Sequence, residues 1–363
     1  MAFNLSAITS MFKKDVGKQA GRTVLGVDVG SSSIKIVQLR DNKGTATLDT
    51  YGELQLGPYG NVDIGRSTSL QTTKLIEALV DIIRESSATS KDAALAISYN
   101  ASFSTIVPIP TKDQSQIDAI VPVEARKYIP LPLNDVLLDW FPVSATSDDV
   151  STKVLLAAIH KDSLEKYQSM LKGAGLKEHL SEIEIFSVIR SCVEQSDNTV
   201  IVIDLGATST KLYVAERGIA GKTHSLRMNG ADLTQAVANT TGLGFKEAET
   251  LKRQAGLTES EENVRNAMVQ ILEKALREID IVTTRYAKDE GVEIHKVVLT
   301  GGGALLKGLP AYVKEKVGKE VVLADPFSKV AYPAFLEDTL MEAGPTFAVS
   351  LGVALRAIKN TEK

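Results

Sequence analysis

Two stretches of the chain, far apart in the sequence, carry an acidic residue, a glycine and small hydroxyl residues in the same order. Residues 24–38 read VLGVDVGSSSIKIVQ and residues 200–214 read VIVIDLGATSTKLYV, so that Asp28 aligns with Asp204 without a gap. A turn that contains glycine lets backbone N–H groups approach phosphate oxygens, and short hydroxyl side chains add further donors. The repetition therefore predicts two loops, one in each half of the chain, that close on the same phosphates.

Each loop also carries a carboxylate and a cation. Mg²⁺ keeps most of its water shell and is held by one or two carboxylates plus phosphate, a role that suits Asp28 and Asp204 if they face each other across a cleft. Lys35 or Lys211 would then offset phosphate charge as a compact cation. For either copy alone, the alternative is an ordinary hairpin whose Asp and Ser satisfy their own turn. The other predicted contacts in the loops are Gly30, Ser31, Ser32, Ser33, Gly206, Ala207, Thr208 and Ser209.

A third pattern that could bind a ligand lies at residues 300–306, which read TGGGALL. A strand that runs through glycines into a helix leaves free N–H groups and the positive end of the helix dipole for a flat or anionic group. A dinucleotide fingerprint is the alternative, since a strand ending in Asp325 follows, but Leu306 stands where that fingerprint has its third glycine. The contacts that we expect from this turn are Gly301, Gly302, Gly303 and Leu305.

A fourth pattern is the segment EAETLK at residues 247–252. On the helix that we predict over residues 245–255, Glu249 and Lys252 lie on one side. Taken alone, this spacing favours an ordinary solvent-exposed ion pair within the helix.

Hydrophobic periodicity predicts the elements that must position these residues. The first loop joins a strand at 24–27 to a strand at 34–39, and a third strand follows at 45–56, whereas P-loop and dinucleotide folds run from strand into helix. The second half repeats this order with strands at 199–203 and 210–215 and another around 224–228. The other predicted strands are 93–98, 104–109, 136–143, 153–159, 296–299 and 321–324, and the other helices are 70–84, 113–128, 161–173, 231–240, 263–289, 304–317 and 344–358.

Residues 102–180 read as an inserted α+β module, in the order strand, helix, strand, strand, helix. The helix at 113–128 is broken by the prolines of residues 129–132, which read IPLP. The closing helix at 344–358 is apolar nearly all round, which indicates that it is buried.

Composition excludes several classes of protein. With 363 residues, 44% of them hydrophobic and 24% charged, the chain is globular and long enough for two or more domains. A net charge of −4 gives no basic surface for nucleic acid. A single cysteine, Cys192, permits no internal disulfide and fits a reducing compartment as a buried thiol. No stretch approaches a membrane span, and the apolar residues among the first 12 are more consistent with a frayed end than with a short interfacial helix.

Together the four patterns resemble the actin-like ATPase superfamily, whose members have two ribonuclease-H-like halves, each with a phosphate loop. The resemblance implies an α/β fold and a Mg²⁺–ATP or Mg²⁺–ADP site between the halves. Residues 248–252 match the superfamily's A-E-x-x-K helix, which implies that Glu249 and Lys252 contact the nucleotide, with Gly230 nearby. A hinge Gln or Glu orients the attacking water in such sites, and Glu184 is the nearest candidate here.

Within the superfamily the chain resembles the PilM family of type IV pilus assembly proteins. The resemblance rests on the opening phrase, on the segments EARKYIP at 124–130 and EIE at 182–184, and on VVLTGGGALLKGLP at 297–310. It implies an inserted subdomain 1C like that of the cell-division protein FtsA. The implied division is a tail at 1–22, subdomain 1A at 23–101 with 336–363, 1C at 102–180, 2A at 181–230 with 292–335, and 2B at 231–291.

The same resemblance implies an ATP-binding adaptor with weak or absent turnover. It would lie in the cytoplasm, peripheral to the inner membrane, and bind the N-terminal tail of PilN in a groove between subdomains 1A and 1C. Through PilN it would connect PilO and the pilus motor ATPases, with self-association left open. The alternatives are an FtsA-like membrane tether, a small-molecule kinase of the same fold, and a structural relative that has lost nucleotide binding. The chain stops soon after the buried closing helix, without the amphipathic tail of such a tether, and the module offers no carboxylate set for phosphoryl transfer.

Overall fold

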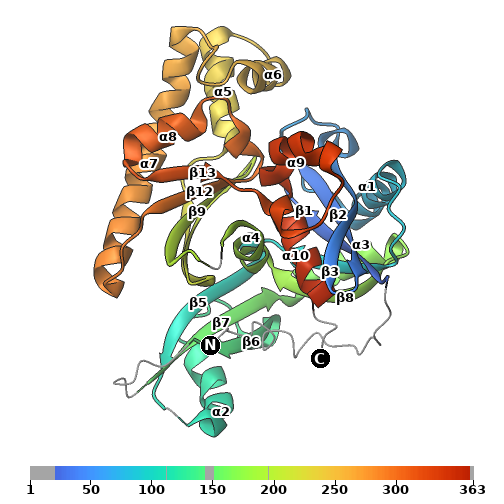
Figure 1. Cartoon of the computed structure of the whole chain (residues 1–363), viewed down its shortest axis with the longest axis vertical. Helices are drawn as coiled ribbons and strands as arrows, with labels where there is room; N and C mark the ends of the chain where they lie inside the picture. Colours follow the sequence, from blue (N-terminus) through green and yellow to red (C-terminus); the bar gives the residue numbers. More distant parts are fainter. Residues whose placement is uncertain (1–20, 112, 144–150, 195, 360–363) are drawn as a thin grey trace.

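The computed structural model describes residues 21–111, 113–143, 151–194 and 196–359, which form two halves and a smaller module (Figure 1). Each half is built on a five-stranded sheet, in the orders β3-β2-β1-β4-β8 and β11-β10-β9-β12-β13. In both sheets the first three strands along the chain pair antiparallel and the next two are added in parallel. The two halves therefore share one topology, as the repeated stretches predict. The N-terminal residues for which we weighed an interfacial helix lie outside the described residues.

The first sheet contains β1 Thr23–Val29, β2 Ser33–Asn42, β3 Thr45–Gln55, β4 Asp92–Ile97 and β8 Lys177–Ile183. The second contains β9 Thr199–Leu205, β10 Thr210–Glu216, β11 Ile219–Leu226, β12 Lys296–Thr300 and β13 Glu320–Leu323. The module contains β5 Ser102–Ile109, β6 Val136–Pro142 and β7 Thr152–His160. The helices are α1 Thr72–Glu85, α2 Gln114–Ala125, α3 Lys161–Gly173, α4 Glu184–Cys192, α5 Gly230–Thr241, α6 Phe245–Ala255, α7 Glu262–Glu290, α8 Leu309–Val317, α9 Glu337–Ala343 and α10 Ala348–Lys359.

The repeated loops are equivalent hairpins at the ends of the first two strands of each sheet. Asp28 lies opposite Lys35 in the strand register, and Asp204 lies opposite Lys211. In each loop, the glycine two residues after the Asp donates its N–H to the carbonyl of the serine three residues further on, at 2.9 and 3.0 Å. The spacing that the two stretches share is therefore the spacing of one hairpin built twice.

The module is shorter than predicted. Its antiparallel sheet, in the order β5-β7-β6, spans residues 102–160, and Figure 1 shows it below the two halves. The predicted boundary at residue 180 is too late, because β8 pairs with β4 in the first sheet and α3 packs on α1. Two parallel neighbours such as β4 and β8 need a crossover connection, usually a helix that covers the sheet. The helix α3 is that crossover, and the module is inserted between β4 and α3.

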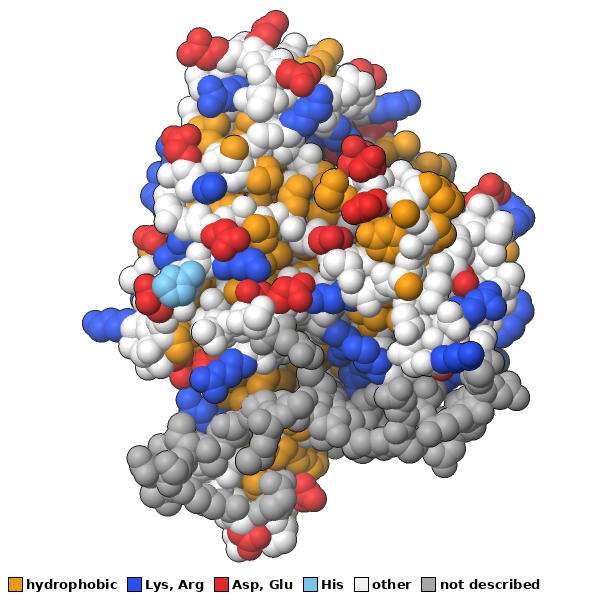
Figure 2. Space-filling view, in the orientation of Figure 1, with side chains coloured by type: hydrophobic (Ala, Val, Ile, Leu, Met, Phe, Trp, Pro, Cys, Tyr) orange, Lys and Arg blue, Asp and Glu red, His pale blue; other side chains and the backbone are white. Residues whose placement is uncertain are grey.

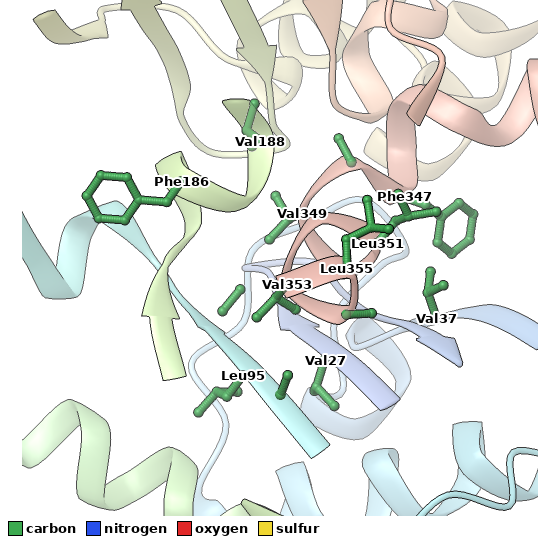
Figure 3. Close-up of a cluster of buried hydrophobic side chains, with 14 of the residues drawn as sticks. Val27, Val37, Leu95, Phe186, Val188, Phe347, Val349, Leu351, Val353 and Leu355 are labelled. Carbon is green, nitrogen blue, oxygen red and sulfur yellow. The ribbon is translucent and has the colours of Figure 1, made fainter. Parts of the chain in front are cut away.

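The closing helix α10 is buried along its length, as predicted, and packs on β1, β2, β4 and α4 (Figure 3). Two glycines permit this close approach. A Cβ at Gly26 on β1 would lie 2.0 Å from the Ser350 carbonyl oxygen, and one at Gly352 would lie 2.0 Å from that of Ser187 on α4. Figure 3 shows Val188 on α4 and Val349 on α10, which belong to the same buried cluster. Because α10 lies beside α4, the chain's last described helix supports the connection between the two halves.

Some predicted elements differ from those observed. The single helix predicted over 304–317 is a short 3₁₀ turn, Gly302–Leu305, followed by α8. The turn ends at Leu306, whose ψ of 119° is not helical, and α8 begins after Gly308, whose φ is +80°. Residues 344–358 likewise begin as a 3₁₀ turn, Gly344–Phe347, before α10. The strand predicted around 224–228 is observed at 219–226. The elements β8, α4 and α9 were not predicted.

Within the described residues, no helix combines the length and the apolar character needed to cross a membrane. Figure 2 shows acidic and basic side chains interspersed over one face of the protein.

Cys192 is buried at the end of α4, and burial raises the pKa of its thiol to about 11. The thiol is therefore neutral at physiological pH, as expected for a structural cysteine.

Candidate functional site

A cavity of about 340 Å³ lies between the two halves. Its lining comes from both repeated loops, the glycine turn after β12, the helix α6 and the first residue of α4. Of the predicted site residues, only Thr208 does not line it. Those that do are Asp28, Gly30, Ser31, Ser32, Ser33, Lys35, Glu184, Asp204, Gly206, Ala207, Ser209, Lys211, Gly230, Glu249, Lys252, Gly301, Gly302, Gly303 and Leu305.

Thr208 instead joins the two loops directly. Its hydroxyl donates to the Ser31 Oγ at 2.7 Å, so one hydrogen bond crosses from the second half to the first. A second contact between the halves places the Arg66 guanidinium 4.1 Å above the ring of Phe245, a distance at which a cation and an aromatic face attract each other. The two halves therefore touch directly at two places, the repeated loops and the Arg66–Phe245 contact.

Two buried carboxylates line the cavity next to the repeated loops. Asp28 and Asp204 are each 9% exposed. Burial raises the pKa of Asp28 to about 6, against the opposing effect of the nearby Lys35 ammonium. Burial also raises the pKa of Asp204, and the opposing effect of the Lys211 ammonium is smaller than the effect of burial. Burial therefore makes the charged form of each carboxylate less favourable, and a bound cation would offset that free-energy cost.

The two lysines of the repeated stretches have different surroundings. The Lys211 Nζ lies 2.6 Å from Glu184 Oε1 and 3.8 Å from Asp204 Oδ2. Burial alone would lower the pKa of Lys211, but these carboxylates raise it above its usual range. Lys35 donates to the Ser33 hydroxyl at 3.0 Å and lies 3.8 Å from Glu53. Of the two cations that we predicted for phosphate, Lys35 is the less engaged, and Lys211 is occupied by carboxylates.

Glu249 and Lys252 form the predicted ion pair, at 2.7 Å, but it is not solvent-exposed. Their side chains are 10% and 11% exposed. Lys252 also donates to the carbonyl of Gly230 at 3.1 Å, and Glu249 accepts from the Thr234 hydroxyl and from Arg253. Burial opposes ionisation of Glu249, yet Lys252 lowers its pKa. The pair is thus a buried, ordered part of the cavity wall that links α6 to the start of α5.

The glycine turn lies directly against the second carboxylate. A Cβ at Gly301, whose φ is +80°, would lie 2.5 Å from Asp204 Oδ1, so only glycine leaves that carboxylate in place. Gly302 has no atom within 4 Å of its Cβ position and is open to the cavity. The dinucleotide alternative is not supported, because the turn leads into a 3₁₀ helix and Asp325 caps another short turn instead of lining the cavity.

Several residues of the cavity wall were not predicted. Glu53 and Gln55 could have been found from strand register, because β3 pairs with β2 so that they lie opposite Lys35 and Ser33. Gly65 reaches the cavity from the loop between β3 and α1, where a Cβ would lie 3.2 Å from Glu249, and no local pattern indicates this approach. The others are Val188, Leu233, Arg253, Thr300, Leu306, Pro345, Thr346, Ala348 and Val349.

The sequence and the fold were compared with those of known proteins. A family model described as type IV pilus assembly protein PilM matches residues 26–358. A solved PilM–PilN type IV pilus biogenesis complex is similar with a TM-score of 0.79, at 24% sequence identity over 92% of this chain and 98% of that chain. Ethanolamine utilization protein EutJ from Carboxydothermus hydrogenoformans is similar with a TM-score of 0.52, at 16% identity over 96% and 94% of the two chains. The MreB5 of Spiroplasma citri bound to ADP is similar with a TM-score of 0.50, at 12% identity over 94% and 99%. These likenesses confirm the predicted actin-like fold.

Proposed function

The chain belongs to the PilM family of type IV pilus assembly proteins, and from this premise we propose that it is a nucleotide-binding adaptor that binds the N-terminal cytoplasmic tail of PilN. The observation that carries the nucleotide part is one cavity lined by both Asp–Gly loops, the glycine turn and the Glu249–Lys252 pair. The family supports the PilN part and favours an adaptor over a membrane tether or a kinase. Through PilN the protein would connect PilO to the pilus motors from the cytoplasmic side of the inner membrane.

The cavity fits a Mg²⁺–nucleotide. Its volume of about 340 Å³ lies within the range of small-molecule sites. Asp28 and Asp204 would hold the ion, since Mg²⁺ takes one or two protein carboxylates and keeps much of its water. Backbone N–H groups and hydroxyls of the two loops would hold the phosphates, with Lys35 as the available cation. The exposed backbone of Gly302 and the buried Glu249–Lys252 pair would contact the nucleoside. When bound, the ion supplies electrostatic stabilisation of phosphate charge.

We propose that any ATP hydrolysis is slow, because the hinge carboxylate is already engaged. Glu184 Oε1 accepts the backbone N–H of Tyr99 at 2.6 Å and meets the Lys211 ammonium at the same distance. The Oε1 atom is therefore occupied by two donors and is not free to accept a proton from water. Only the second oxygen, Oε2, is left to orient a water molecule in the cavity.

Replacing Glu184 with alanine is expected to lower this residual turnover about tenfold. In a fully active site, loss of one positioned proton acceptor lowers the rate by a factor of about 10²–10⁴, and the loss is smaller here because one oxygen of Glu184 is already engaged. ATP affinity is expected to stay the same or rise, because Lys211 loses its carboxylate partner and becomes free to approach phosphate. Phosphate release under single-turnover conditions measures the first effect and calorimetry the second. Turnover equal to that of the unaltered protein would show that Glu184 has no part in hydrolysis.

The PilN tail would bind where the module faces the first half. Leu137 and Phe141 of β6 pack against the hydrophobic cluster that contains the core of the first half, and Asp139 between them lies on the same face of the strand. The Asp139 Oδ1 atom accepts the Trp140 N–H at 2.9 Å, whereas Oδ2 is buried and accepts no hydrogen bond from the described residues. Burial raises the pKa of Asp139 to about 6, against the opposing effect of the Arg356 guanidinium. A buried carboxylate oxygen without a hydrogen-bond partner supports recognition of a cationic group, such as the amino terminus of a peptide tail.

A synthetic PilN tail peptide is therefore expected to bind the Asp139→Asn variant about tenfold more weakly at pH 7.5. The carboxylate is charged above its pKa of about 6 and becomes protonated below it, so the difference between the two proteins should narrow at pH 5.5. Asp135→Asn, which changes an exposed residue of the 3₁₀ turn just before the same strand, is the matched control. Fluorescence anisotropy at both pH values makes the comparison. Equal affinities of the Asp139→Asn variant and the unaltered protein at pH 7.5 would place the peptide elsewhere.

A further inference from the structure

One carboxylate joins three parts of the molecule. Glu184 is the first residue of α4, is 5% exposed and lines the cavity. Its Oε1 atom accepts the Tyr99 N–H from the first half and contacts Lys211 from the second half. Tyr99 stands at the point where the chain leaves β4 and enters the module. The same oxygen therefore connects the wall of the cavity with the base of the module.

The connection from Tyr99 to the module has no flexible spacer. Tyr99 begins the 3₁₀ turn Tyr99–Ala101, and β5 starts at the next residue, Ser102. The Ser102 hydroxyl donates back to the carbonyls of Ser98 and Tyr99, at 3.0 and 3.2 Å. The strand β5 then pairs with β7 along its whole length, from Ser102 to Ile109. A shift of the Tyr99 amide must therefore move the start of the module's sheet.

The connection from Glu184 to the cavity depends on charge. Lys211 lies between Glu184 and Asp204, so two carboxylates share one buried ammonium. A phosphate near Lys211 would compete with Glu184 for that ammonium, and a cation at Asp204 would release Lys211 toward Glu184. These exchanges are strong because charges interact strongly where water is excluded. The strength with which Glu184 holds the Tyr99 N–H therefore depends on what occupies the cavity.

We propose that the hydrogen bond from the Tyr99 N–H to Glu184 couples occupancy of the cavity to the position of the module, so that nucleotide regulates the affinity for the partner peptide. This inference rests on the proposed function, because it takes a nucleotide in the cavity and a peptide beside the module as its two ligands. By linkage, each ligand then changes the affinity of the other by the same factor.

The test removes the backbone N–H of residue 99, and a control accounts for the loss of the tyrosine ring. Proline has no backbone N–H and is tolerated at the first position of a helical turn. The residue before it must be extended, and Ser98 has φ −61° and ψ 148°. Tyr99→Pro therefore deletes the donor in a backbone that accepts proline. Tyr99→Ala, which loses the same ring and keeps the N–H, is the matched control.

Peptide affinity is measured by anisotropy with and without Mg²⁺ and a non-hydrolysable ATP analogue. We expect the analogue to change the peptide Kd at least about fivefold in the unaltered protein and in Tyr99→Ala. In Tyr99→Pro the change is expected to fall below about twofold while each ligand still binds alone. A full nucleotide effect in Tyr99→Pro, or none in the unaltered protein, overturns the coupling. If either ligand fails to bind the unaltered protein alone, the proposed function fails instead.

Hydrogen exchange gives a second measurement that needs no peptide. Glu184→Gln keeps an oxygen that can accept the Tyr99 N–H, whereas Glu184→Ala does not. Exchange of the Tyr99 amide is expected to be at least about tenfold faster in Glu184→Ala than in Glu184→Gln, and to change when the analogue binds the unaltered protein. Equal exchange in both variants, or no response to the analogue, contradicts the proposal.

Discussion

Replacing Asp28 and Asp204 together with alanine is expected to abolish Mg²⁺–ATP binding. The two carboxylates are the buried acids at the ends of the equivalent strands β1 and β9, and burial raises the pKa of both because no cation fully compensates their charge. A bound Mg²⁺ contributes several kcal/mol of phosphate charge stabilisation, and each 1.4 kcal/mol is a factor of ten in affinity. Each single replacement is therefore expected to weaken Mg²⁺–ATP binding at least about 100-fold, as measured by titration calorimetry.

The control separates loss of the site from loss of the fold. Asp162→Ala removes an exposed acid from the first turn of α3, in the same half of the molecule as Asp28. Its affinity for Mg²⁺–ATP should equal that of the unaltered protein. Asp28→Asn keeps the shape of the side chain and removes only its charge, so it should lose binding as fully as Asp28→Ala. Retained affinity in Asp28→Asn or in the double variant would mean that the nucleotide does not use this end of the cavity.

Glu182→Ala is expected to cost about 3–5 kcal/mol of folding stability, the range for removing one partner of a buried ionic group. Glu182 is 2% exposed, on β8, and its carboxylate accepts from Arg190 of α4 and from Arg356 of α10. Arg190 also donates to the Gly352 carbonyl at 2.9 Å. Without Glu182, the buried Arg356 and the half-buried Arg190 lose the carboxylate that they share at the point where β8, α4 and α10 meet. Urea denaturation measures the loss.

The stability that Glu182 contributes is expected to depend on pH. Burial alone would raise the pKa of Glu182, but Arg190 and Arg356 outweigh it and lower the pKa to about 2. A folded-state pKa below the unfolded value contributes stability that is present above the unfolded pKa and is lost as the pH falls through the folded one. The difference in stability between the two proteins should be constant from pH 8 to 5 and shrink below pH 4.

Glu178→Ala is the matched control, since Glu178 lies on the same strand and accepts hydrogen bonds from Gln168 and Ser181 in a half-buried setting. Its expected cost is about 1 kcal/mol. A cost below about 1 kcal/mol for Glu182→Ala would show that the ionic cluster is not what fastens α10 and α4 to the first sheet.

Much of the cavity could be predicted because its residues are arranged by local rules. The two loops are hairpins, so the seven-residue spacing from Asp28 to Lys35 predicts a cross-strand pair, and the same holds for the second copy. Gly301 was predicted for similar reasons, since strand, glycine and turn are consecutive in the sequence. In each case the chemistry lies within a few residues of the element that positions it.

Other parts could not be predicted from local pattern. The elements α3 and β8 have the same appearance whether they extend the module or complete the first sheet, and the assignment depends on pairing between β8 and β4. The Glu249–Lys252 spacing is that of an exposed ion pair, and its burial depends on Gly65 and Thr234 packing around it. Periodicity describes one element at a time and does not say which face of another element will cover it.

The amino-acid sequence by itself determined that the chain has two similar halves, each with an Asp–Gly loop, and that a glycine turn and an acidic–basic helix belong to the second. Those features depend on residue type and on spacing within one hairpin or one helical turn. Only the tertiary structure decided that Glu184 contacts both Tyr99 and Lys211. These three residues lie on separate elements, and their distances are set by how α10 and α4 pack between the sheets. The resemblance made Glu184 a candidate for the hinge, and the packing gives its carboxylate a place between the cavity and the module.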